Sequence, residues 1–491
     1  MMKAKLISFL LIISILVPVL SVRAFSDDVS AGAPDSGKIG AEYNPDDRIK
    51  PENLPESGCR AVYAADLATG KVFYEKNAHQ KMYPASTTKI LTALLVLENC
   101  SLTEKAKVSQ NALNLVPPGY SSAHLRAGEE FDIETLLKAL LIPSANEAAN
   151  VLAEHVGGSI ETFVDMCNKR AKELGCEILH FVNPNGIHDD NHYCSAYDLY
   201  LIAKECRRYE AFNRIVASKS FTVPATDIYP REDRAFNNTD EMLLPGRYFC
   251  SYCTGIKTGH TKPAGECFVG SAYSEDTQII SVVLGGSEYN SRGLNDRFDT
   301  TKQIYEFIYG NYSNRRILSA GDVFCSIEVG KAEKETASLD LIADRDIYSF
   351  ISDTAAPEDI KTSVAVRDGI TAPLDKGTVL GTLTVSADGL VYKTDLVASH
   401  DVEKLPYARY NLIIAAVFLL TAAVLALILS KSKKNRKPLF YLSVAIIVFE
   451  ILCFVISGVR ISGKSETRFP QDFAGEIVSD DEIIQNKPEA R

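Results

Sequence analysis

Apolar residues recur along residues 59–315 with two different periods. Runs in which apolar and polar residues alternate predict strands, whereas apolar residues spaced three or four apart predict helices. The alternating runs predict a β-hairpin with strands at 60–66 and 72–75, and a second hairpin with strands at 266–274 and 277–285. The helical runs predict helices at about 86–97, 136–156 with a break at Pro143, 160–174, 195–208 with a capping box at Ser195 and Asp198, and 305–309. Strands at both ends with helices between them predict an α+β domain with one antiparallel sheet.

Residues 316–400 follow a purely alternating pattern. Turn dipeptides, of which Asp368-Gly369 and Asp388-Gly389 are examples, separate the apolar runs of this region. The expected strands are 323–329, 363–366, 378–385 and 389–396. This part of the chain is therefore predicted to be a small all-β domain. It has no set of residues suited to catalysis, so we expect it to be a spacer or a contact surface.

The beginning of the chain has the pattern of an export signal. Residues 1–24 place two lysines before a short apolar run and end at Ala24, which predicts a signal peptide cleaved after that residue. An uncleaved membrane anchor is the alternative, but the apolar run is short for a spanning helix. Residues 25–58 are rich in Asp, Gly, Pro and Ser, which predicts a flexible lead-in.

Two long apolar segments lie near the other end. Residues 411–430 and 439–458 each have about the length needed to cross a bilayer. The basic loop 431–438 between them is expected to stay in the cytoplasm. The chain is therefore predicted to form a transmembrane helical hairpin in a cell membrane, with residues 25–410 and the acidic tail 459–491 outside the cytoplasm. Interfacial helices are the alternative for either segment.

Composition and charge narrow the classes of function. Of the 491 residues, 46% are hydrophobic and 23% are charged, as expected of a globular protein of several domains. The net charge of −11 argues against a nucleic-acid partner. Ten of the eleven cysteines precede the membrane segments, and their irregular spacing favours free, buried thiols over disulfides. His188 and His192 have a metal-like spacing, but they lie in a predicted loop, and we expect neither a metal nor a cofactor.

The strongest chemical signal is Ser86-Thr87-Thr88-Lys89. A serine and a lysine three residues apart lie on the same face of a helix, one turn apart. A serine at a helix N-terminus also lies beside free backbone N–H groups. The pair is therefore suited to be a nucleophile and its amine base. The pattern is short, however, and Ser430 and Lys433 repeat it beside a membrane segment.

Two further motifs supply the groups that an acylating serine needs. Ser144 and Asn146 follow Pro143, which should break the helix and let both side chains project from the bend. Lys257-Thr258-Gly259 offers a cation beside a sheet edge that could bind an extended peptide by main-chain pairing. The order S-x-x-K, S-x-N, K-T-G is a signature of β-lactamases and penicillin-binding proteins.

From about residue 60 to residue 398 the chain resembles the D-alanyl-D-alanine carboxypeptidases, the low-molecular-weight penicillin-binding proteins. The stretches that carry the resemblance are residues 83–89, 142–149, 181–186 and 255–261. The resemblance implies a β-lactamase/transpeptidase-like domain at 59–315. It also implies the substrate, a peptidoglycan stem peptide ending in D-Ala-D-Ala, and inhibition by β-lactam antibiotics. The chain departs from the family pattern at Asn185, where a histidine is frequent, and in its predicted hairpin, where a surface helix is usual.

The same resemblance implies roles for individual residues. Ser86 would be the acyl-ester nucleophile, Lys89 its proton acceptor, and Ser144 a proton relay to the leaving group. The remaining residues would hold the substrate: Asn146, Lys257, Thr258, Gly259 and His260, with the backbone N–H groups of Ser86 and His260 stabilising the oxyanion. The expected function is removal of the terminal D-alanine in cell-wall maturation.

Two other classes of function share these motifs. A class A-like β-lactamase would need a loop glutamate to drive deacylation, and none is convincing in the sequence. A non-catalytic membrane receptor for wall peptide or β-lactam is the other alternative, and the intact set of Ser, Lys, Ser, Asn and Lys residues argues against it. Endopeptidase and transpeptidase activities remain open, because the same acyl-enzyme serves each.

Overall fold

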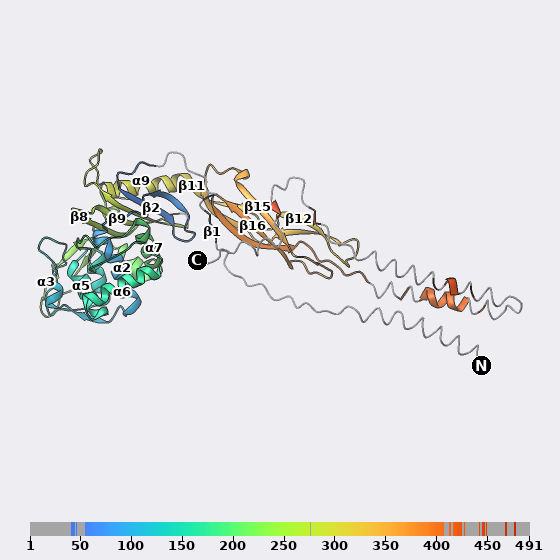
Figure 1. Cartoon of the computed structure of the whole chain (residues 1–491), viewed down its shortest axis with the longest axis horizontal. Helices are drawn as coiled ribbons and strands as arrows, with labels where there is room; N and C mark the ends of the chain where they lie inside the picture. Colours follow the sequence, from blue (N-terminus) through green and yellow to red (C-terminus); the bar gives the residue numbers. More distant parts are fainter. Residues whose placement is uncertain are drawn as a thin grey trace.

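The computed structural model describes residues 41–44, 46, 55–274 and 276–406, with short pieces and single residues between 412 and 477. Two bodies follow one another along the molecule (Figure 1). The first combines a sheet with a cluster of helices, and the second consists of β-strands. The predicted order of an α+β domain and an all-β domain is therefore confirmed.

The first body is built on a five-stranded antiparallel sheet in the order β3-β2-β10-β9-β8. Both predicted hairpins are present in it. The strands are β2 (Ala61–Asp66), β3 (Val72–Lys76), β8 (Cys253–Thr261), β9 (Gly265–Ser274) and β10 (Thr277–Gly286). The lysine of the K-T-G motif thus lies on a strand, β8, at the edge of the sheet.

Both faces of this sheet are covered. Because side chains alternate along a strand, Ala61, Tyr63 and Ala65 of β2 pack against the helical cluster, whereas Val62 and Ala64 pack on the opposite side. That opposite side is covered by α9 (Asp296–Asn311), which is longer than the predicted helix at 305–309. The sheet is therefore a rigid central layer, and only its edge at β8 is left to face the site.

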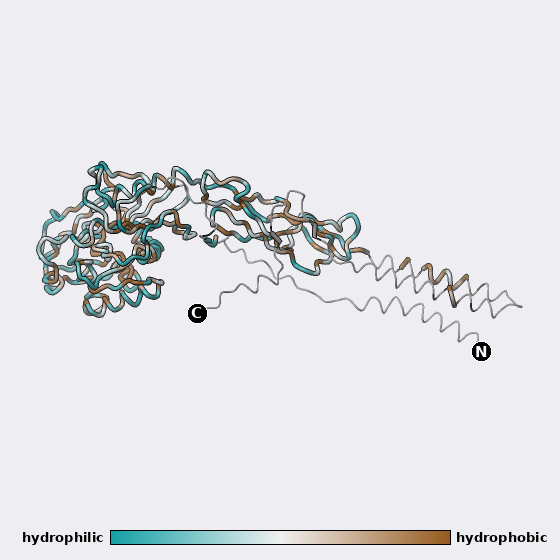
Figure 2. Tube along the Cα trace, turned by 45° about the horizontal axis from the view of Figure 1, so that its top comes forward, coloured by the Kyte–Doolittle hydropathy of each residue, from teal (hydrophilic) through white to brown (hydrophobic). Residues whose placement is uncertain are grey.

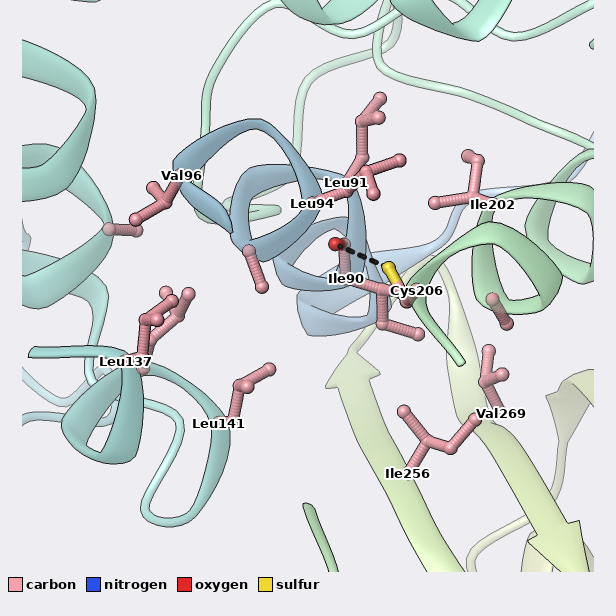
Figure 3. Packing of buried hydrophobic residues seen from close by; sticks show 14 of the residues in the cluster. Ile90, Leu91, Leu94, Val96, Leu137, Leu141, Ile202, Cys206, Ile256 and Val269 are labelled. Atoms are coloured by element: carbon pink, nitrogen blue, oxygen red, sulfur yellow. Dashed lines mark hydrogen bonds between the residues drawn. The ribbon is translucent and has the colours of Figure 1, made fainter. Parts of the chain in front are cut away.

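The helical cluster surrounds α2 (Lys89–Asn99), whose first eight residues are all buried. Leu137 and Leu141 approach it from one side, and Ile202 and Cys206 from the other (Figure 3). The thiol of Cys206 donates a hydrogen bond to the carbonyl oxygen of Ile90 at 3.5 Å. The surrounding helices are α4 (Ile133–Leu141), α5 (Asn146–Gly157), α6 (Ile160–Glu173), α7 (Ala196–Cys206) and α8 (Glu210–Val216), with short α3 (Gln110–Asn114) at the periphery.

Local sequence signals account for several helix ends. The helical run at 136–156 is interrupted as predicted, since α4 ends before Pro143 and α5 begins at Asn146. The predicted capping box is present, because the side chains of Ser195 and Asp198 each bond to the other's backbone at the start of α7. The interruption at Pro143 places Ser144 and Asn146 at the corner between α4 and α5.

The second body is a sheet of β12 (Val323–Glu328), β13 (Ser338–Ala343), β15 (Ile360–Val366), β16 (Val379–Ala387) and β17 (Leu390–Ala398), while β11 (Tyr312–Leu318) pairs with β14 (Ile347–Ser352). The strands β11, β13 and β14 were not predicted. The β-strand pairing begins at Tyr312, four residues before the boundary expected at residue 316.

A buried ion pair joins the two bodies. Lys71, in the turn between β2 and β3, lies with its amine 2.5 Å from the carboxylate of Asp388, in the turn between β16 and β17. Burial lowers the pKa of Lys71, and the neighbouring carboxylate opposes that shift. The backbone N–H of Ser352 also donates to this carboxylate at 3.0 Å.

Parts of the predicted lead-in and tail take part in the second body. In the lead-in, β1 (Glu42–Tyr43) pairs with β17, so the expectation of a wholly flexible segment is wrong for these residues. In the acidic tail, β18 (Thr467–Arg468) pairs with β12 and β19 (Glu476–Ile477) pairs with β15. Strands from both ends of the chain therefore extend the same sheet.

The predicted signal peptide at 1–24, the basic loop 431–438 and most of the two apolar segments lie outside the described residues. In the part of the chain that is described, no helix is both long enough and apolar enough to span a membrane. In the first segment, Leu412 is 71%, Ile413 57% and Leu420 69% accessible. The described pieces at this end of the molecule are largely hydrophobic (Figure 2).

The ten cysteines from Cys59 to Cys325 are all free thiols. Seven of them are buried: six in the first body, and Cys325 in the second. The prediction of mostly free thiols is confirmed for these residues. Cys453 lies outside the described residues.

Candidate active site

The serine and lysine of the first motif lie one turn apart, as predicted. A 3₁₀ turn (Ala85–Thr88) leads directly into α2, so Ser86 precedes the first α-helical residue, Lys89. The amine Nζ of Lys89 lies 3.0 Å from the hydroxyl of Ser86. Ala85, just before the serine, has a φ of 49°, a conformation that non-glycine residues rarely adopt. The nucleophile therefore follows a strained backbone position.

Lys89 is completely buried, and its amine has three partners. Nζ lies 2.9 Å from Oδ1 of Asn146 and 2.6 Å from the carbonyl oxygen of Asn185, in addition to the hydroxyl of Ser86. Burial holds the pKa of Lys89 well below its usual value, and the positive charge of Lys257 lowers it further. Glu147 acts in the opposite direction but less strongly.

The chemistry of these partners fits a neutral amine. A neutral amine has two N–H groups and one lone pair. The two carbonyl-type oxygens of Asn146 and Asn185 can only accept, so they take the two N–H groups. The hydroxyl of Ser86 can donate to the remaining lone pair. Lys89 is thus arranged to take the proton of Ser86, which is the requirement for a general base.

Ser144 and Asn146 lie at the corner between α4 and α5. Ser144 has a φ of 65° and is 4% exposed, and its hydroxyl has no hydrogen-bond partner among the described residues. A strained, buried and unpaired hydroxyl is costly unless it serves another partner. The side-chain amide of Asn146 donates to the carbonyl of Ser121 at 2.8 Å, which leaves its oxygen oriented toward Lys89.

The edge strand β8 passes directly beside the start of the serine turn. A Cβ atom on Gly259 would lie 2.9 Å from the carbonyl oxygen of Pro84 and 3.0 Å from the backbone nitrogen of Ser86. Real side chains do not tolerate such distances, so glycine is required at this position. The close approach puts the N–H of Ser86 beside residues 259 and 260 of the edge strand.

Lys257 is also buried, and its amine donates to the carbonyl of Thr258 at 3.0 Å. Burial and the charge of Arg297 lower the pKa of Lys257 to about 7. The hydroxyls of Thr258 and Thr239 lie 2.6 Å apart beside it. Burial disfavours the charged form of Lys257, and a bound anion would stabilise that form. Lys257 and Thr258 are therefore suited to bind a carboxylate.

His260 is half exposed, and its ring nitrogen Nδ1 lies 2.8 Å from the carboxylate of Glu266. Glu266 also pairs with Arg297, whose guanidinium donates to the carbonyl of Gly259 at 3.2 Å. The buried carboxylate of Glu266 thus links His260 to Arg297, which holds the backbone of β8 at Gly259. The structure places all eight predicted site residues on the S-x-x-K turn, the α4–α5 corner and β8.

Sequence reasoning missed several residues that complete this arrangement. The carbonyl of Asn185 reaches Lys89 because Gly186 packs against Ala85, where a Cβ atom would lie 1.9 Å from the carbonyl oxygen. Asp240 is buried near Lys257 and Arg297, and burial raises its pKa to about 6. The asparagine-rich stretch 183–186 belonged to a recognised motif, but no local signal identified a backbone carbonyl or Asp240 as part of the site.

His192 supports the serine turn instead of offering a free metal ligand. The backbone N–H of Val182 donates to its Nδ1 at 3.1 Å, so the neutral ring has its proton on Nε2, which lies 2.8 Å from the hydroxyl of Thr88. Thr88 in turn donates to the carbonyl of Ala85 at 2.8 Å. Burial lowers the pKa of His192 to about 3, which keeps the ring neutral.

Comparison with known proteins agrees with this geometry. Residues 49–288 match the family model described as D-alanyl-D-alanine carboxypeptidase, and residues 312–404 match the C-terminal domain of penicillin-binding protein 5. The carboxypeptidase DacF of Bacillus subtilis is 32% identical over 352 residues, which cover 70% of this chain and 85% of that protein. The chain belongs to the D-alanyl-D-alanine carboxypeptidase family.

More distant members of the carboxypeptidase family share sequence and fold with this chain. DacA of Escherichia coli is 28% identical, over 72% of this chain and 85% of its own length. Crystal structures of penicillin-binding protein 3 from Streptococcus pneumoniae and penicillin-binding protein 5 from Haemophilus influenzae superimpose with TM-scores of 0.53 and identities of 27% and 25%. The superpositions cover 71% and 72% of this chain and the whole of each of the two structures. The protein is a serine-type D-Ala-D-Ala carboxypeptidase, and the two alternative classes of function are not favoured.

The close approach at Gly259 gives a test of the carboxypeptidase site. We expect Gly259→Ala to slow acylation by a fluorescent penicillin roughly tenfold to hundredfold, because the added methyl group must push β8 away from Ser86. Gly310→Ala is the matched control, since a Cβ atom there meets nothing within 4 Å. Equal acylation rates for both variants and the unmodified enzyme would contradict the inferred approach.

The two lysines predict the pH dependence of the carboxypeptidase. The pKa of Lys89 is lowered, so its neutral form is present above that pKa and kcat/KM should fall as acid protonates it. Lys257, with a pKa of about 7, loses its charge as the pH rises, so binding of a free carboxylate should weaken on the alkaline side. Because Lys89 and Lys257 interact, the apparent pKa values of the acid and alkaline limbs of kcat/KM belong to the pair of lysines and not to either one alone.

The measurement is kcat/KM against pH for a D-Ala-D-Ala peptide and for the same peptide with an amidated C-terminus. The amidated peptide should keep the acid limb and lose the alkaline one. An alkaline limb of equal size for both peptides would show that Lys257 does not bind the carboxylate.

Proposed function

We propose that Ser86 removes the terminal D-alanine of a peptidoglycan pentapeptide through an acyl-enzyme. The single observation that carries this mechanism is the contact between the buried amine of Lys89 and the hydroxyl of Ser86, at 3.0 Å. The peptide would lie in extended form along β8, where main-chain pairing with a free strand edge provides affinity. Its terminal carboxylate would bind Lys257 and Thr258.

In the acylation step, the oxygen of Ser86 attacks the carbonyl carbon of the D-Ala-D-Ala bond while Lys89 takes the serine proton. The negative charge that develops on the carbonyl oxygen is met by the backbone N–H groups of Ser86 and His260. The proton then passes to the nitrogen of the leaving D-alanine through the hydroxyl of Ser144, which has no partner within the described residues. The C–N bond breaks and D-alanine leaves with its proton.

In the second step, water attacks the ester carbon and Lys89 again accepts the proton. The ester bond to Ser86 breaks, the serine recovers its proton, and the shortened peptide is released. A β-lactam would acylate the same oxygen, but its leaving nitrogen stays attached to the acyl group. Attack by the amine of a second peptide instead of water would give transpeptidation. If a cross-linked peptide acylated Ser86, the cross-linking amine would leave with the proton, and attack by water would complete endopeptidase cleavage.

The nearest candidate for a deacylating glutamate is Glu147, in the first turn of α5. Its Oε1 accepts hydrogen bonds from the hydroxyl of Ser122 at 2.6 Å and the backbone N–H of Ala123 at 2.8 Å. This carboxylate therefore holds the loop 121–125, whose Ser121 carbonyl orients Asn146. Because Glu147 holds this loop, it is not placed as the base of a β-lactamase. We therefore expect a long-lived penicillin adduct and not rapid β-lactam hydrolysis.

The carboxypeptidase proposal is tested by following free D-alanine and the shortened peptide by mass after incubation with a pentapeptide. We expect stoichiometric release of both, and loss of more than a thousandfold in rate for Ser86→Ala, because covalent catalysis has no replacement nucleophile. Ser430→Ala, in the second S-x-x-K pattern, is the control and should keep full activity. Covalent labelling of Ser86→Ala by fluorescent penicillin would show that another residue is the nucleophile.

We also propose that the protein is exported by residues 1–24 and held in the cell membrane by a helical hairpin of 411–430 and 439–458. The apolar composition of both segments and the basic loop 431–438 support this topology. The pairing of β18 with β12 is a further support, because the chain enters the first segment after the β domain and is beside that domain again at Thr467. Both ends of the hairpin would then lie on the outer side.

This topology is tested with an epitope tag in loop 431–438 or at the C-terminus of the full chain in spheroplasts. External protease should remove the C-terminal tag and leave the loop tag intact. A chain ending at residue 406 is the control for anchoring and should leave the membrane fraction. Digestion of the loop tag in intact spheroplasts would contradict the hairpin.

A further inference from the structure

A second group of chemically reactive side chains lies at the far end of the helical body. The sulfur of Cys100, a carboxylate oxygen of Glu104 and an imidazole nitrogen of His155 all lie within 4.8 Å of one another. We refer to these three residues as the Cys100 cluster. Within the residues that the structure describes, it is the one group of three or more such side chains that converges in this way.

The Cys100 cluster lies where two helices of the active site end. Cys100 caps the C-terminus of α2, which begins at Lys89, and His155 lies in the last turn of α5, which begins at Asn146. The C-terminal end of a helix carries a partial negative charge, and two such ends meet here. The local field therefore favours a cation, in addition to the charge of Glu104.

The backbone around these ligands is already held in place. The N–H of Cys100 donates to the carbonyl of Val96, and the N–H of Glu104 donates to the carbonyl of Ser101, so a closed turn carries both residues. The carbonyl of Glu104 in turn accepts from Ile133, at the start of α4. Binding of an ion would need side-chain adjustment only, which lowers its entropic cost.

The distances are close to those of a zinc site. Zinc binds sulfur and nitrogen at about 2.0–2.3 Å, which puts neighbouring ligand atoms roughly 3.3–3.8 Å apart. Nε2 of His155 and Oε1 of Glu104 are 2.8 Å apart and would have to separate slightly. Both side chains can move, since 23% and 45% of them are accessible to solvent. Since no two of the three ligand atoms are more than 4.8 Å apart, no separation would have to shrink by more than about 1 Å.

The neighbouring Glu154 is not available as a fourth ligand. Its two oxygens accept hydrogen bonds from Ser109 at 2.6 Å and Asn111 at 2.7 Å. The fourth position of a tetrahedral ion would therefore face solvent and take a water molecule. A thiolate, an imidazole and a carboxylate together select a borderline-soft cation over magnesium or calcium, which prefer oxygen ligands alone.

We propose that Cys100, Glu104 and His155 bind a zinc-type divalent cation that ties the C-terminal end of α2 to that of α5. The ion takes no part in the reaction of Ser86. It braces the two helices whose N-terminal ends present Lys89 and Asn146. Binding releases the thiol proton of Cys100 to solvent, and the ion remains in its divalent state.

The test uses the full-length protein, purified and freed of metal with a chelator. Titration with Zn²⁺ should give one equivalent bound per chain and raise the melting temperature by about 5 to 10 °C at a hundredfold excess over Kd. Titration with Co²⁺ should give a thiolate-to-metal charge-transfer band. Cys100→Ser should abolish the band and the thermal shift, and His155→Gln should weaken binding at least tenfold.

Cys176→Ser and His79→Gln are the matched controls. His79 forms a pair with Glu177 at 2.8 Å, next to Cys176, but the sulfur of Cys176 lies 3.6 Å from the carbonyl of Asp198 and does not join that pair. Both controls should bind the metal as the unmodified protein does. Labelling by fluorescent penicillin would show that each variant is folded.

Two results would overturn the proposal. If the unmodified protein bound no more zinc than Cys100→Ser, the Cys100 cluster would not be a metal site, and His155 and Glu104 would form only their hydrogen bond. If the charge-transfer band survived in Cys100→Ser, another thiol would be the ligand.

Discussion

The burial of an uncharged amine at Lys89 is the constraint on which the site depends. An ammonium group enclosed in this way would need an anionic partner, yet its three bonded neighbours are two carbonyl-type oxygens and a hydroxyl. The neutral form satisfies all of them and directs one lone pair at Ser86. The start of α2, the start of α5 and the Asn185 carbonyl each contribute one neighbour. These three segments must therefore keep their relative positions for the base to work.

The fold keeps those segments in position although several of their backbone conformations are strained, because the surrounding core is tightly packed. Ala85 and Ser144 adopt left-handed backbone conformations, and Gly186 and Gly259 allow main-chain contacts that no side chain would permit. Each is costly alone. They persist because α2 is buried on all sides and because the sheet is covered on both faces. The site is thus a junction between a rigid helical cluster and one exposed strand edge, with the cation of Lys257 along that edge.

The second body is coupled to this junction from the opposite side of the sheet. The pair of Lys71 and Asp388 is almost completely buried, so removing either partner would leave an uncompensated charge. This contact orients the catalytic body with respect to the β domain, whose sheet also takes strands from the lead-in and the tail.

Features that depend on residues close together in the chain could be predicted from the amino-acid sequence. Hydrophobic periodicity predicted both hairpins and the main helices, Pro143 predicted the α4–α5 corner, and three motifs predicted the site residues from Ser86 to His260. The sequence did not predict β13, or β11 and β14, which pair with each other across some thirty residues of intervening chain, nor the pairing of β1 with β17. It also could not give the neutral state of Lys89 or the roles of Asn185, Asp240 and His192. Those depend on burial and on which polar groups converge in space, and only the tertiary structure decides both.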